Sequence, residues 1–252
     1  IYGMTLFLFF RLSLRVLGDK LISSVAAFSV LLLYYFGWDA PLSYSHTILA
    51  TLFIVAGILA LIRLNDHGDL LSFISLGLVF GFGLLSKYTF GLFIFASLIS
   101  GFYWSSLRQR LLSPMIFLSL GIMVLIFLPH AVWLIGNIDN IVSSVIYKFE
   151  ISSSIGGFLT RGKGLFTGLA SVFSFLSPLW LLLGICFWEP ICRRWKNSFN
   201  DEEVLKFFLR YFCVLGVFLL FVIIVIGVSK IRAHYMFVLI PAPIAFFIWI
   251  KP

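Results

Sequence analysis

Two isolated charges at the borders of long apolar segments are the first residues of this sequence that could carry chemistry. Asp39 lies between two apolar segments and is followed two positions later by Pro41, and Lys87 follows an apolar segment directly. A charge at mid-depth in lipid costs about 2.5–3.5 kcal/mol, so such side chains usually face a polar cavity or one another. The simpler alternatives are a helix cap for Asp39 and an interfacial, snorkelling lysine for Lys87.

Cations and aromatic residues gather at two other apolar borders. Lys230, Arg232 and His234 lie within five residues and could hold a phosphate or pyrophosphate. His130 follows a proline, and Trp133 lies one helical turn further on. Interfacial anchoring by basic and aromatic side chains explains both groups equally well.

Residues 137–164 form the longest connection that is not continuously apolar. Arg161 and Lys163 lie near its end, after a stretch rich in serine and glycine that suggests mobility. A basic, partly apolar loop of this kind suits an anionic amphiphile, and it equally suits a plain connection beside anionic head groups.

Together these residues predict a cavity with one carboxylate, several cations and aromatic walls. The cations could neutralise a phosphate leaving group while the carboxylate takes a proton from an acceptor hydroxyl or amine. That is the chemistry of sugar transfer from a polyprenyl-phosphate donor. Two alternatives remain: a transporter or flippase for a lipid-linked or anionic solute, and a scaffolding subunit. Many transporters have repeated halves with broken helices, and this sequence shows no such repeat.

The composition indicates which elements must position these side chains. The chain has 252 residues, of which 62% are hydrophobic and only 11% charged, whereas soluble domains carry about 25% charged residues. Such a chain needs lipid as solvent, and only helices and closed barrels span lipid. Because the apolar segments are continuous rather than alternating, we predict an all-α, polytopic transmembrane bundle. The net charge of +8 does not indicate nucleic-acid binding, because the basic residues are scattered singly.

The apolar segments predict about nine helices in a single transmembrane domain covering residues 1–252. The expected ranges are 1–16, 21–36, 42–62, 70–86, 89–104, 111–136, 165–188, 207–228 and 235–250. The chain is expected to be a fragment truncated at both ends, because its first apolar segment is half of what a bilayer needs.

Basic residues are distributed unequally between the two sets of connections. About two thirds of the 18 lysines and arginines fall on the side that includes Arg63 and Arg108. The positive-inside rule places that side in the cytoplasm. Asp39, Lys87 and His234 are then expected to face outward from a cytoplasmic membrane, in a multi-pass protein.

Four motifs resemble one family of membrane enzymes. The glycine-rich segment 77–89, ending in Ser86-Lys87-Tyr88, resembles the helix that ends in Ser/Thr-Lys-Tyr in the dolichyl-phosphate-mannose-protein mannosyltransferase-like family. This family has the GT-C fold and is similar to the bacterial aminoarabinose transferases. Segments 38–42, 129–137 and 232–241 resemble three further motifs of the family, in matching order over nearly the whole chain.

This resemblance implies an inverting glycosyltransferase with a polyprenyl-phosphate sugar donor and a lipid, glycan or protein acceptor. The principal acidic motif of the family lies in a first outer loop for which this chain has no match. Asp39 would then be the second acidic residue of the catalytic site, and Lys87 would contact the lipid phosphate. The other candidate substrate-binding residues are Tyr88, His130, Arg161, Lys163, Arg232 and His234. We name no metal ligand, and a requirement for a divalent cation stays open.

Overall fold

The described part of the chain is built from helices, as the composition predicts. The computed structural model describes residues 1–39, 46–149, 158–189, 191 and 203–250, with only the backbone for residues 39, 158 and 159. Within these ranges there is no strand, and one isolated bridge pairs Leu33 with Pro178. The α-helices are α1 (Tyr2–Leu17), α2 (Lys20–Ser29), α4 (Thr47–Asp66), α5 (Leu70–Ser86), α6 (Phe90–Phe102), α7 (Ser105–Leu111), α8 (Ile116–Gly136), α9 (Ile138–Phe149), α10 (Phe158–Leu176), α11 (Leu179–Cys186), α13 (Glu203–Phe221) and α14 (Ala242–Ile250). Shorter 3-10 or π segments are η1 (Val30–Leu32), η2 (Tyr35–Asp39), η3 (Val222–Ile226) and η4 (Ala233–Leu239).

Several of these helices are long and apolar enough to cross a membrane. By length and composition, α4, α8 and the continuous segment α13–η3 qualify alone. Two bent pairs qualify together: α6 with α7, bent by 119°, and η4 with α14, bent by 44°. The protein is therefore an integral membrane protein with an all-α, polytopic fold.

Glycines let α5 and α8 pack closely. A Cβ atom on Gly77 would lie 2.6 Å from the backbone oxygen of Ser119, and one on Gly81 would lie 2.9 Å from Cβ of Ile126. The hydroxyl of Ser119 donates a hydrogen bond of 2.7 Å to the carbonyl oxygen of Phe73. This pairing of α5 with α8 fixes the direction of α5, and hence the position of the residue that follows it.

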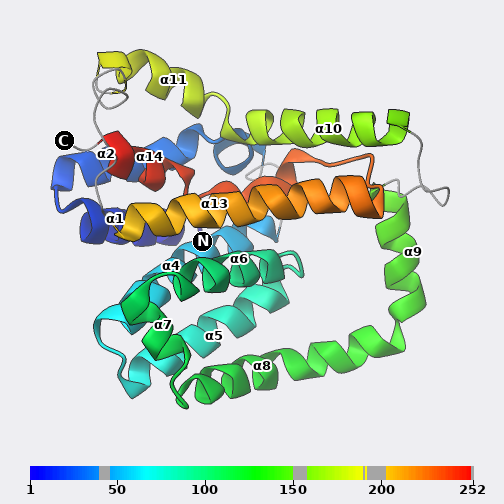
Figure 1. Ribbon diagram of the computed structural model, residues 1–252, viewed down its shortest axis with the longest axis horizontal. Helices are drawn as coiled ribbons and strands as arrows, with labels where there is room; N and C mark the ends of the chain where they lie inside the picture. The colour runs from blue at the N-terminus through cyan, green and yellow to red at the C-terminus, as the bar shows by residue number, and fades with distance from the viewer. Residues whose placement is uncertain (40–45, 150–157, 190, 192–202, 251–252) are drawn as a thin grey trace.

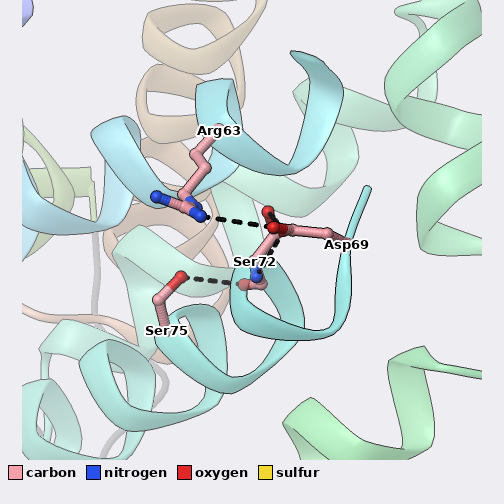
Figure 2. A network of polar contacts seen from close by, with 4 residues as sticks. All are labelled: Arg63, Asp69, Ser72 and Ser75. Carbon is pink, nitrogen blue, oxygen red and sulfur yellow. Dashed lines mark hydrogen bonds and ion pairs between the residues drawn. The ribbon is translucent and has the colours of Figure 1, made fainter. Parts of the chain in front are cut away.

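The connection between α4 and α5 is held by polar contacts at the end of the bundle opposite Lys87. Asp69 caps α5 by accepting hydrogen bonds from the backbone N–H of Ser72 at 2.9 Å and from its hydroxyl. The guanidinium of Arg63 lies 3.3 Å from the same carboxylate, and the Ser75 hydroxyl donates to the Ser72 carbonyl (Figure 2). These hydrogen bonds, above all the one from the Ser72 side chain, lower the pKa of Asp69. Arg15, at the end of α1, pairs with Asp66 at 2.5 Å.

Helix α9 was not predicted, because residues 137–164 were interpreted as a loop. It follows α8 and runs across the direction of α8 and α10 (Figure 1). Its apolar residues recur at helical spacing, with Ile138, Val142, Val145 and Phe149 spaced three to four positions apart. None of its side chains is fully buried, so this amphipathic spacing, rather than continuous hydrophobicity, was the signal that the prediction overlooked.

Three predicted helices are interrupted. The range 21–36 changes at Ser29 to a 3-10 turn and then a π turn. The range 165–188 breaks at the cis peptide bond between Ser177 and Pro178, and the range 235–250 breaks beside Pro241. A proline has no N–H and disfavours helical geometry in the residue before it, which explains the last two interruptions.

Candidate functional site

Lys87 is the cation around which the candidate site is built. Helix α5 ends at Ser86, and Lys87 takes an extended backbone conformation in the short break before α6. This turns its side chain toward two segments that are distant in sequence. The ammonium nitrogen donates to Oγ1 of Thr47 at 2.8 Å and to the carbonyl oxygen of His234 at 3.1 Å.

Two aromatic rings complete the surroundings of this ammonium group. Its nitrogen lies 5.2 Å from the ring centre of Tyr235 and 4.7 Å from that of Phe237, distances at which a cation is attracted to a ring face. Burial lowers the pKa of Lys87 to about 8. No ion pair to Lys87 is present among the described side chains. We call Lys87, Thr47, His234, Tyr235 and Phe237 the Lys87 cluster.

Other basic side chains surround the cluster. His46 directly precedes Thr47, and partial burial, followed by the charges of Lys87 and Lys148, lowers its pKa. Lys148 lies in the last turn of α9 next to Phe149, whose ring lies 4.8 Å from that of Tyr235. The sequence analysis did not include His46 or Lys148 among the site residues.

The segment 232–235 contributes both a cation and two rings. The exposed Arg232 precedes η4, and its carbonyl accepts from the backbone N–H of Tyr235 at 3.0 Å. The ring of His234 packs against Tyr235 at 4.2 Å and lies 6.2 Å from Tyr35. His234 therefore contributes its backbone oxygen to Lys87 and its ring to an aromatic group.

Tyr88 forms a second group with His130, a residue of α8. The hydroxyl of Tyr88 lies 2.6 Å from Nε2 of His130, and the two rings stack at 5.4 Å. Trp133 extends the stack, 5.5 Å from the imidazole and inclined by only 15°. The adjacent residues Lys87 and Tyr88 therefore point toward different parts of the bundle.

The remaining predicted site residues lie elsewhere or outside the described side chains. Asp39 is the last residue of η2, and its side chain lies outside the described part of the structure. Arg161 and Lys163 lie in the first turns of α10, Arg161 half-buried and Lys163 exposed. Among the described contacts, none joins Arg161 to the Lys87 cluster.

An apolar cavity of about 650 Å³ borders the Lys87 cluster. Tyr235 belongs to both, because its ring lies beside the Lys87 ammonium and lines the cavity. The other walls come mainly from aliphatic and aromatic side chains of α10 and α13, such as Val172, Leu176, Phe212 and Leu219. This arrangement can accommodate an amphiphile whose anionic group meets Lys87 and whose apolar chain fills the cavity.

The partners of Lys87 were not identified from the sequence. Thr47 lies 40 positions before Lys87, and the second acceptor is a backbone oxygen, which has no residue-type signature. Among the described residues, no group of three His, Cys, Asp or Glu side chains could hold a metal ion.

Comparisons with known proteins agree with the motifs. The family model described as dolichyl-phosphate-mannose-protein mannosyltransferase matches residues 1–133. Lipopolysaccharide core galacturonosyltransferase RgtA of Rhizobium johnstonii is 32% identical over 164 residues, which cover 64% of this chain and 32% of the relative. RgtB of the same organism is 26% identical over 193 residues, which cover 76% of this chain and 37% of the relative. The chain thus spans about a third of the length of these relatives, and no solved structure matches it.

Proposed function

Because this chain belongs to the dolichyl-phosphate-mannose-protein mannosyltransferase family of GT-C membrane glycosyltransferases, we propose that the protein transfers a sugar from a polyprenyl-phosphate donor to an acceptor. The observation that carries this proposal is the position of Lys87, a partly buried cation beside Tyr235, whose side chain lines a large apolar cavity. The transfer takes place on the non-cytoplasmic face of the cytoplasmic membrane, as the distribution of basic residues favours.

The site fits the two unlike parts of such a donor. An isoprenoid chain buries apolar surface, and about 25 cal/mol per Å² of buried area favours its entry into the cavity. The phosphate needs a cation that is fixed before it arrives. Lys87 is held by two hydrogen bonds, so little side-chain freedom is lost when an anion binds.

In the proposed reaction, a hydroxyl or amine of the acceptor attacks the anomeric carbon of the sugar. The bond from that carbon to the phosphate oxygen breaks, and the polyprenyl phosphate leaves with the electron pair. Negative charge grows on the phosphate in the transition state, so Lys87 stabilises that state more than the ground state. A carboxylate takes the acceptor proton, and Asp39 is the acidic residue of this chain proposed to support that step.

The sugar and the acceptor are proposed from the relatives. The names of RgtA and RgtB favour a galacturonosyl group as the transferred sugar and a lipopolysaccharide core as the acceptor. The cations Lys148 and Arg232 near the cluster suit a sugar that carries a carboxylate.

Reconstitution of the full-length protein in proteoliposomes tests the proposal. A labelled polyprenyl-phosphate galacturonate donor and a purified lipopolysaccharide core acceptor are supplied, and labelled acceptor is measured. Formation of labelled product supports the proposal, whereas passage of labelled donor across the bilayer without product would favour the transporter alternative.

A further inference from the structure

The segment between η3 and η4, residues 227–232, contains three buried residues although it is not helical. Val228, Ser229 and Ile231 are at most 7% exposed, and Arg232 has an extended backbone. Peptide groups in such a segment have no helical partners, and an unpaired buried peptide group is costly, above all where water is excluded. This segment leads directly into the residues that contact Lys87.

Side chains of α10 supply partners for this backbone. The hydroxyl of Ser171 donates to the carbonyl oxygen of Ile231 at 2.7 Å. The hydroxyl of Thr167 reaches the carbonyl oxygens of Ser229 at 3.0 Å and of Gly164 at 3.2 Å, and the N–H of Ile231 donates to Thr167 Oγ1 at 3.4 Å.

Two glycines let α10 approach the segment closely enough for these bonds. A Cβ atom on Gly164 would lie 2.3 Å from the carbonyl oxygen of Val228. A Cβ atom on Gly168 would lie 3.2 Å from Ile223 and 3.5 Å from Ile231. The side of α10 that carries Gly164, Thr167, Gly168 and Ser171 is therefore fitted to the backbone of residues 228–231.

We propose that Thr167 and Ser171 are positioning residues for the phosphate site. They hold the backbone of Ser229 and Ile231, and this places the His234 carbonyl and the Tyr235 ring against Lys87. The inference rests on the proposed function, because it assumes that Lys87 binds the donor phosphate. Thr167 and Ser171 act through the Lys87 cluster and do not touch the donor.

Binding of polyprenyl phosphate to the full-length protein in nanodiscs tests the role of α10. Thr167→Val with Ser171→Ala removes hydroxyl hydrogen bonds that are each worth up to about tenfold in an equilibrium, so we expect the apparent Kd to rise about tenfold or more. The conservative pair Thr167→Ser and Ser171→Thr retains the hydroxyls and should restore binding to within about threefold. Ser174→Ala changes an exposed serine of the same helix and serves as the matched control.

A double-mutant cycle with Lys87 separates positioning from a general loss of packing. If Thr167 and Ser171 act through Lys87, the variant that combines their substitutions with Lys87→Ala should have a Kd less than twofold higher than that of Lys87→Ala alone. The inference would be overturned if the increase in Kd for the combined variant were the product of the separate increases. Unchanged binding by the α10 variant would overturn it as well. If Lys87→Ala itself binds like the wild type, the proposed function fails instead, so the two failures are distinguishable. A single cooperative melting transition in the α10 variant, even at a lower temperature than in the Ser174→Ala control, would confirm that it is folded.

Discussion

The ammonium group of Lys87 lies 3.1 Å from the carbonyl oxygen of His234, a residue 147 positions further along the chain. The first of these residues lies within the range matched by the family model, and the second lies beyond it. The proposed phosphate site is therefore assembled from both halves of the chain. Its cation depends on a backbone atom, which substitution of His234 alone would leave in place.

Removal of the Lys87 ammonium should strongly reduce sugar transfer. Lys87→Ala is expected to lower kcat/KM by about 10²–10³-fold, as is typical when one preorganised electrostatic group is lost. Transfer of labelled sugar in proteoliposomes measures the effect, with the amount of inserted protein checked for each variant. Arg63→Ala, which breaks the ion pair with Asp69 at the other end of the bundle, is the control and should transfer at nearly the wild-type rate. A wild-type rate for Lys87→Ala would leave the likeness to the family as one of fold alone.

The pH dependence of transfer should report the titration of Lys87. Burial lowers its pKa from 10.5 to about 8, so the free protein loses this positive charge as the pH rises through 8. We expect kcat/KM for the donor to be constant below that pH and to fall above it, by up to about tenfold per pH unit. The same alkaline decrease in Lys87→Ala would show that another group causes it.

Deprotonation of Lys87 should increase the stability of the fold, although it lowers the rate of transfer. A lysine with a lowered pKa in the folded state binds its proton less tightly there than in the unfolded chain. Its contribution to the free energy of unfolding therefore increases as the pH rises from about 8 toward 10.5. Comparing the melting temperatures of the wild type and Lys87→Met across this range checks the sign. A larger stability gain with pH in Lys87→Met than in the wild type would contradict it.

Close packing between α5 and α8 predicts a steric effect at Gly77. A methyl group there would meet the Ser119 backbone oxygen at 2.6 Å, so Gly77→Ala should destabilise the protein by about 1–3 kcal/mol. Gly121→Ala places the same methyl group on α8, where nothing lies within 4 Å, and should be neutral or slightly stabilising. Thermal unfolding in detergent measures both, and equal melting temperatures for the two variants would exclude the close approach.

The distribution of basic residues predicts which end of the bundle faces the cytoplasm. After replacement of the native cysteines, Tyr147→Cys on α9 should react with an impermeant thiol reagent added to intact cells, since Tyr147 is 85% exposed. His67→Cys, in the connection between α4 and α5, should react only after the cells are opened. Labelling of position 67 from outside would invert the topology.

The continuous apolar segments of the fold were predictable, but its interruptions were not. The boundaries of α1 and α5 agree with the expected ranges to within one residue, because Gly18 marks the end of α1 and Asp69 caps the start of α5. Helix α9 was missed because its apolar residues recur at helical spacing on one face and do not form a continuous apolar segment. The break at Pro178 was signalled by the proline itself, which the helical interpretation of 165–188 passed over.

The residue types of the site were easier to predict than their contacts. Lys87 stood out because a lysine at an apolar border is costly, but nothing in the sequence indicated that Thr47 would accept its hydrogen bond. The adjacent residues Lys87 and Tyr88 could not be assigned to different neighbours by spacing. These directions depend on the backbone conformation of the break after α5, which only the structure gives.

The separation of Lys87 from His234 in sequence also affects how the protein is made. At about 5–20 residues per second, the ribosome needs roughly 7–30 s to go from one to the other. Throughout that interval the nascent lysine lacks the carbonyl and the aromatic rings that cover it in the finished fold. A chain terminated before residue 234 would therefore leave the ammonium group with Thr47 as its hydrogen-bond partner but without the carbonyl and rings supplied by residues 234–237.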